Sequence, residues 1–77
     1  MGATTIDAPT WGAVIPAGPE LWRVRERRGR ILGHVRIVAG AGEPPRYRAE
    51  RFHAPTHGFR TLGEFSTARD AMDSLRV

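Results

Sequence analysis

The chain has 77 residues and no cysteine, and its formal net charge is +4 at pH 7. This length supports one small domain with a thin core, and the lack of cysteine excludes a disulfide framework and a thiolate metal site. We therefore expect an intracellular protein of the cytoplasm. No apolar run approaches the roughly 20 residues that cross a bilayer, and the N-terminus has no signal-peptide pattern, so we expect no membrane partner.

The positive charge is concentrated in the middle of the chain. Residues 21–53 contain nine arginines and three glutamates, whereas residues 54–77 contain three arginines and three acidic residues. All twelve basic residues are arginine, a usage that a GC-rich genome also produces, so their placement carries more weight than their identity. A local excess of this kind favours polyanionic partners.

Residues 1–20 predict a flexible N-terminal arm, because they combine small residues, glycines and prolines without helical or alternating order. The arm contains an apolar island. It could dock on the chain's own domain, on a second copy to form a homodimer, or on a partner protein, and the sequence leaves these readings open. The island consists of Trp11, Val14 and Ile15.

Residues 21–38 show the alternation of a β-hairpin. Trp22 and Val24 fall on one side of the first arm, and the dipeptide GR at residues 29–30 supplies a tight reversal. Gly33, in the second arm, marks either a bulge or a close backbone approach. The positions on the opposite side of the two arms are Arg23, Arg25, Arg27, His34 and Arg36.

A third strand is predicted over residues 46–53, RYRAERFH, after the loop AGAGEPP. Phe52 breaks its alternation, so either a bulge shifts the phase near Glu50 or Phe52 covers the far edge of the sheet. Residues 59–65, FRTLGEF, fit a short fourth strand or an ordered loop. The outward positions of the third strand are Arg46, Arg48 and Glu50.

The C-terminal segment predicts an amphipathic helix. Thr67 followed by Asp70 fits a capping box, and apolar residues then recur at helical spacing. The predicted fold is α+β: a small antiparallel meander of three or four strands in a single β-β-β-α domain over residues 21–77, with the helix packed on one face. The predicted core is Trp22, Val24, Ile31, Val35, Ile37, Tyr47, Phe59, Leu62, Phe65, Met72 and Leu75.

With a helix on one face, the other face of the sheet would display the basic side chains. Such a face suits duplex nucleic acid, DNA rather than RNA, because a small sheet fits the major groove and arginine binds phosphates and guanine bidentately. Two readings compete with it: a solvated face neutralised by glutamates, and a protein-interaction module that meets an acidic partner surface. The candidate nucleic-acid-binding residues are Arg23, Arg25, Arg27, His34, Arg36, Arg46 and Arg48.

The succession of hairpin, third strand and short helix, with WRVRERRGRILGHVR followed by FSTARDAMDSL, resembles the AP2-like DNA-binding domains at the N-terminus of tyrosine recombinases. The resemblance covers about residues 21–75. It implies a free-standing DNA-binding protein of bacterial or phage type that uses a three-stranded sheet. The contacts implied by the resemblance are Arg23, Arg25, Arg27, Arg36, Arg46 and Arg48.

The residues give no pattern for catalysis. His53 and His57 are four residues apart, but a proline between them prevents a shared helical face, and no cysteine completes a zinc site with His34. Ser66 and Ser74 fit a helix cap and a helix position, without a nucleophile motif. We therefore expect a non-enzymatic protein with no metal and no cofactor.

Overall fold

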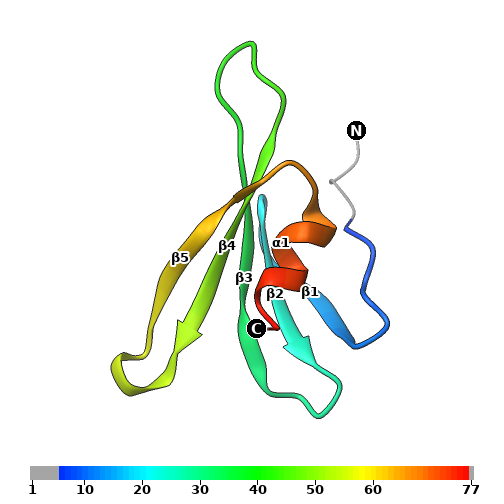
Figure 1. Cartoon of the computed structure of the whole chain (residues 1–77), viewed down its shortest axis with the longest axis vertical. Coiled ribbons are helices and arrows are strands. Elements are labelled where there is room, and N and C mark those ends of the chain that lie inside the picture. Colours follow the sequence, from blue (N-terminus) through cyan, green and yellow to red (C-terminus); the bar gives the residue numbers. More distant parts are fainter. Residues whose placement is uncertain (1–5, 77) are drawn as a thin grey trace.

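Segments of alternating apolar and polar side chains form an antiparallel sheet, which is covered by one α-helix (Figure 1). The structure is a computed structural model, and it describes residues 6–76. The strand order is β1-β2-β3-β4-β5, so each strand pairs with its sequence neighbours. The predicted α+β class is confirmed, but the predicted count of three or four strands is wrong, because the sheet has five. The elements are β1 (Gly12–Gly18), β2 (Leu21–Glu26), β3 (Ile31–Val38), β4 (Arg46–His53), the 3-10 helix η1 (Ala54–Thr56), β5 (Gly58–Phe65) and α1 (Ala68–Ser74).

The additional strand β1 lies within residues 1–20, where the composition predicts a flexible arm. It pairs with β2, and Val14 stands opposite Val24. Glycine and proline weaken a central strand, but β1 is an edge strand, which tolerates Pro16 because one of its sides makes no ladder bonds. The prediction of an arm without regular structure is therefore wrong for residues 12–18, and residues 1–5 lie outside the described part of the chain.

The pairing of β5 with β4 shows on which face Phe52 of the third predicted strand lies. The register between β4 and β5 shifts between Ala49 and Glu50, and Leu62 is the extra residue on the β5 side. The bulge therefore belongs to β5, and the alternation of β4 continues unbroken to Phe52. Phe52 stands opposite Phe59, on the face away from the core.

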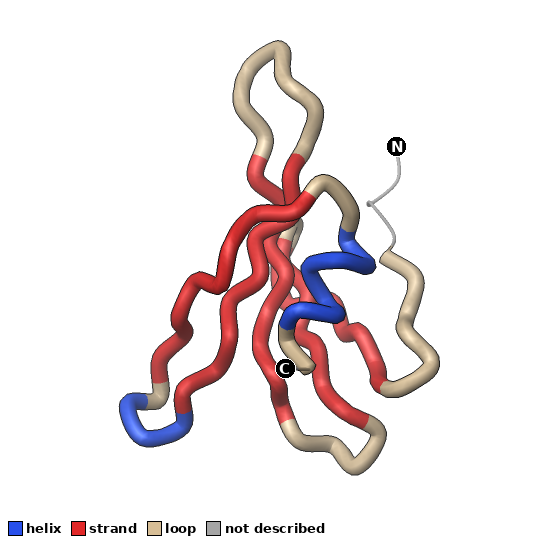
Figure 2. Tube along the Cα trace, viewed as in Figure 1, coloured by secondary structure: helices blue, strands red, loops and turns tan. Residues whose placement is uncertain are grey.

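The core lies on the sheet face against which α1 packs (Figure 2). Burial of Val24 and Val35 on this face places their chain neighbours on the opposite face. Small side chains at Ala49 and Ala71, which the predicted core omits, fill the contact between β4 and α1. The buried apolar residues are Trp22, Val24, Val35, Ala49, Ala71, Met72 and Leu75.

Three residues of the predicted core are exposed: Ile31 to 37%, Phe59 to 42% and Leu62 to 42%. Leu62 is the bulge residue of β5, and Phe59 points away from α1. Ile31 precedes a second register shift, at which Leu32 is the extra residue and packs against the core instead. Both bulges change which side chains face the core, and a bulge leaves no clear trace in the hydrophobic pattern.

Helix α1 is fixed at both ends. The Thr67 Oγ1 atom accepts a hydrogen bond of 3.1 Å from the backbone N–H of Asp70, which confirms the predicted cap. At the other end, Nη2 of Arg51 donates to the carbonyl oxygens of Ser74 and Leu75, each at 3.4 Å. A helix of seven residues is marginal alone, so these contacts and its buried face hold it. Nowhere in residues 6–76 is a helix long and apolar enough to cross a bilayer.

Candidate nucleic-acid interface

We call the sheet face opposite α1 the open face. The register defines it, because Arg23 stands opposite His34 and His34 stands opposite Glu50. Cross-strand partners share a face, and their chain neighbours Val24 and Val35 are buried on the other. The charged side chains of the open face are Arg23, Arg25, Arg36, Arg46, Arg48, Glu50 and Glu64.

Arg27 departs from its predicted place on the first strand. β2 ends at Glu26, whose backbone oxygen accepts a hydrogen bond of 2.9 Å from the N–H of Gly29. Gly29 has a φ of 95°, a conformation that glycine adopts readily. The turn interrupts the alternation, so Arg27 lies with Arg28 and Arg30 at the tip of the β2–β3 hairpin.

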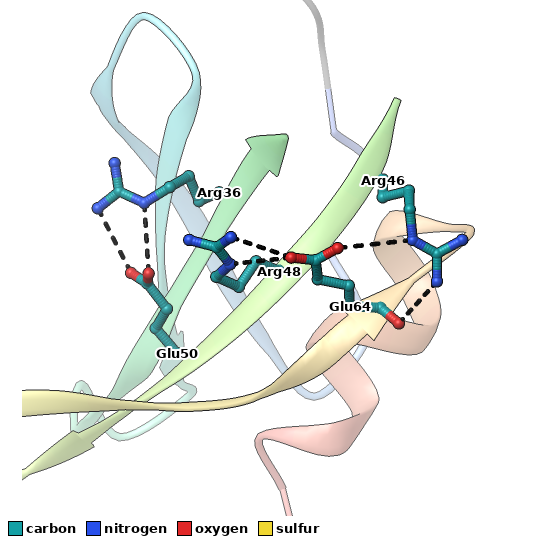
Figure 3. A network of polar contacts seen from close by, with 5 residues as sticks. All are labelled: Arg36, Arg46, Arg48, Glu50 and Glu64. Atoms are coloured by element: carbon teal, nitrogen blue, oxygen red, sulfur yellow. Dashed lines mark hydrogen bonds and ion pairs between the residues drawn. The ribbon is translucent and has the colours of Figure 1, made fainter. Parts of the chain in front are cut away.

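Three of the predicted arginines are held by two glutamates (Figure 3). Nε of Arg36 lies 3.3 Å from Oε2 of Glu50. Glu64 bridges two arginines, with Nη2 of Arg48 at 3.0 Å and Nε of Arg46 at 3.7 Å. The sequence suggests Glu50 as an arginine partner, but Glu64 reaches the face only through the pairing of β5 with β4. The positive charge of this part of the open face is therefore largely balanced by carboxylates of the same face.

In the part of the chain that the structure describes, the remaining arginines of the β2–β3 hairpin have no carboxylate partner. All of them are exposed, and within residues 6–76 none forms an ion pair. The uncompensated charge of the interface therefore lies on this hairpin, beside the neutralised arginines of β3 and β4. We call this set the free arginines. It consists of Arg23, Arg25, Arg27, Arg28 and Arg30.

His34 lies on the open face but is only 9% exposed. Its ring stacks against the ring of Phe59, with the centroids 4.1 Å apart and 18° between the planes. Burial first, and then the neighbouring Arg23, lower the pKa of His34 below the ordinary value of 6.5, so the ring is neutral at pH 7. His34 thus supports Phe59 from beneath. Among the described residues, its buried Nε2 atom has no hydrogen-bond partner.

The apolar island of the N-terminal segment is divided between the two faces. Trp11 and Val14 pack against the core of the chain's own domain, and the guanidinium carbon of Arg76 lies 4.9 Å from the centre of the Trp11 ring. Ile15 stands opposite Arg23, on the open face. Trp11 and Val14 therefore dock on the chain's own domain, which is one of the alternatives that the sequence leaves open.

The two histidines near η1 lie at the turn between β4 and β5, where His53 lines the same cleft as Arg30. His53 places Nδ1 3.0 Å from Oγ1 of Thr56, and His57 ends η1 with a φ of 55°. Throughout residues 6–76, no cluster of three or more histidine, cysteine or acidic side chains could hold a metal ion.

Neither a protein-family model, nor a curated protein, nor a solved structure matches the chain. The resemblance to AP2-like domains therefore stays a prediction. Function has to be inferred from the side chains of the open face and of the hairpin tip.

Proposed function

We propose that this protein is a non-enzymatic nucleic-acid-binding protein that contacts duplex DNA through the β2–β3 hairpin. The observation that carries the proposal is the set of free arginines, which have no carboxylate partner within residues 6–76. Among the described arginines, Arg60, Arg69 and Arg76 also form no ion pair, but they are separate positions on β5 and in the C-terminal segment. The five free arginines instead follow one another along β2 and its turn.

The arrangement of the free arginines favours a polyanion. Arg23 and Arg25 are two residues apart on one side of β2, about 7 Å along the strand, and Arg27, Arg28 and Arg30 belong to one turn. Neighbouring free arginines therefore lie within the Debye length of about 10 Å at 0.1 M salt and repel one another, and bound phosphates would relieve the repulsion. Guanidinium groups also bind phosphate oxygens bidentately. The proposed binding energy is therefore mainly electrostatic and independent of sequence.

The shape of the hairpin favours a duplex. A two-stranded β-ribbon fits the major groove, which is about 12 Å wide, and the β2–β3 hairpin is such a ribbon only at its tip, because β1 and β4 flank its strands. In this arrangement Arg27, Arg28 and Arg30 at the tip would enter first, while Arg23 and Arg25 would follow the groove edge and its phosphates. The paired arginines of β3 and β4 lie farther along the open face, away from the hairpin tip.

A salt titration with random duplex DNA tests the proposal. Each phosphate contact contributes about −0.9 to the slope of log K against log salt, so contacts by the five free arginines predict a slope of about −4.5. Arg25→Ala should make the slope less negative by about 1, whereas Arg69→Ala, on α1 behind the sheet, should leave it unchanged. Absence of measurable affinity at low salt would overturn the proposal and favour an acidic protein partner.

A further inference from the structure

Phe59 is an exposed aromatic residue on the open face. It stacks on His34 almost in parallel, at 18° between the ring planes, and is 42% exposed although one of its faces is covered. Phe52 supports it from the side, with the ring centroids 5.4 Å apart and the planes tilted by 55°. The two neighbours fix the orientation of the Phe59 ring and leave its outer face available for a further flat group.

A cleft with Phe52 in its wall lies towards the hairpin tip. It has a volume of about 650 Å³ and lies between the start of β3 and the turn after β4, where the β2–β3 and β4–β5 hairpins diverge (Figure 1). Its walls include Phe52 and the exposed Ile31, and the free arginine Arg30 lies at its edge. Apolar walls beside a positive charge suit a ligand that is both flat and anionic.

We propose that Phe59 is a stacking position for one unpaired base of a nucleic-acid strand. The inference rests on the proposed function, because the free arginines supply the contacts to the phosphates on either side of that base. A duplex with a single-stranded extension would use both the free arginines and Phe59. Its phosphates would contact the hairpin, while its first unpaired base would stack on Phe59.

The charges around the ring favour a base over an aromatic side chain of a protein. Arg23 stands opposite His34 on β2 and belongs to the free arginines, while Glu50, opposite His34 on β4, is paired with Arg36. A base in a strand carries a phosphate on each side, which these guanidinium groups would bind, whereas a buried phenyl or indole group brings no such charge. Stacking on an aromatic ring is tolerant of base identity, because every base has a flat π-face.

Fluorescence anisotropy with two probes at one salt concentration tests the inference. The probes are a blunt duplex and the same duplex with a single-stranded extension. Stacking of one base on an aromatic residue predicts that the wild-type protein binds the extended probe about 5- to 150-fold more tightly. Phe59→Leu keeps an apolar cover over His34 and should abolish this preference, while Phe59→Trp should retain it. Neither change should alter the affinity for the blunt duplex.

The outcomes separate the two proposals. Equal affinity of the wild-type protein for both probes, or a preference that survives in Phe59→Leu, would overturn the stacking position while leaving duplex binding intact. Binding of the extended probe alone would support the stacking position and overturn duplex binding. Thermal unfolding of each variant checks that it is folded, and because Phe59→Trp keeps a flat ring, loss of the preference in folded Phe59→Trp would also overturn the inference.

Discussion

At the scale of single residues, His34 shows how a polar side chain becomes buried on an exposed face. Alternation along β3 predicts its face correctly, but the ring that covers it comes from β5. Phe59 belongs to a segment that the sequence leaves open between strand and loop. No periodic pattern within β3 could reveal this cover, because it depends on the pairing of two later strands.

The lowered pKa of His34 predicts a pH-dependent stability. A histidine whose pKa is lower in the folded protein binds fewer protons there than in the unfolded chain. Its titration therefore costs no stability while the pH stays above the ordinary pKa of 6.5. As the pH falls below this value, the free energy of unfolding should decrease. Urea unfolding at a series of pH values between neutral and mildly acidic measures the effect. His34→Leu should show a weaker dependence, and an equal dependence in both proteins would contradict the burial of a neutral ring.

Gly33 predicts a steric effect on stability. The sequence offers a bulge or a close backbone approach at this position, and both are present, because Leu32 beside it is the bulge residue and a Cβ atom at Gly33 would collide with the backbone oxygen of Glu50 on β4. Gly33→Ala should therefore lower the free energy of unfolding by about 1–3 kcal/mol. Gly58→Ala is the matched control, because its Cβ would meet Thr56 Oγ1 at an ordinary 3.5 Å, and should change stability by less than about 1 kcal/mol. Equal effects in urea unfolding would refute the close approach.

At the scale of elements, the sequence predicts the parts that have regular local patterns. The alternation of β2, the turn at Gly29 and the cap at Thr67 are all present in the structure. The edge strand β1 is missed, because glycines and a proline conceal a segment that is held mainly by pairing with β2. β5 is missed in part, because the bulge at Leu62 breaks its alternation.

Strand β5 also lowers the net positive charge of the open face, because its Glu64 pairs with two arginines. Glu64→Gln removes the carboxylate that holds Arg46 and Arg48, so both arginines become available for phosphates. The slope of log K against log salt for duplex DNA should become more negative by about 1 to 2. Because exposed ion pairs contribute only about 0–1 kcal/mol, the fold should be kept.

Asp73→Asn is the matched control for Glu64→Gln, since it changes the net charge equally but lies on α1, behind the sheet. It should leave the salt slope almost unchanged. Circular dichroism of both variants checks the fold. If the two substitutions raised the affinity equally, binding would depend on net charge alone, and the open face would have no special part in it.

At the scale of the whole molecule, the sheet separates two kinds of surface. The helix and the core occupy one face, while the other face carries paired arginines on β3 and β4 beside an exposed aromatic ring on β5. The free arginines continue this second surface to the hairpin tip. The separation of apolar and cationic side chains was predictable from alternation in β2 and β3, but the pairing of Arg46 and Arg48 required Glu64 of the fifth strand.

Nitrogen NMR spectra of the arginine side chains, recorded while duplex DNA is added, test the central claim most directly. The Nε–H signals of Arg23, Arg25 and Arg30 should shift during the titration, because these groups have no carboxylate partner within residues 6–76 and lie on the hairpin that we propose contacts DNA. The signal of Arg69 on α1 should stay in place. Shifts confined to Arg69, or an unchanged spectrum at low salt, would contradict the account.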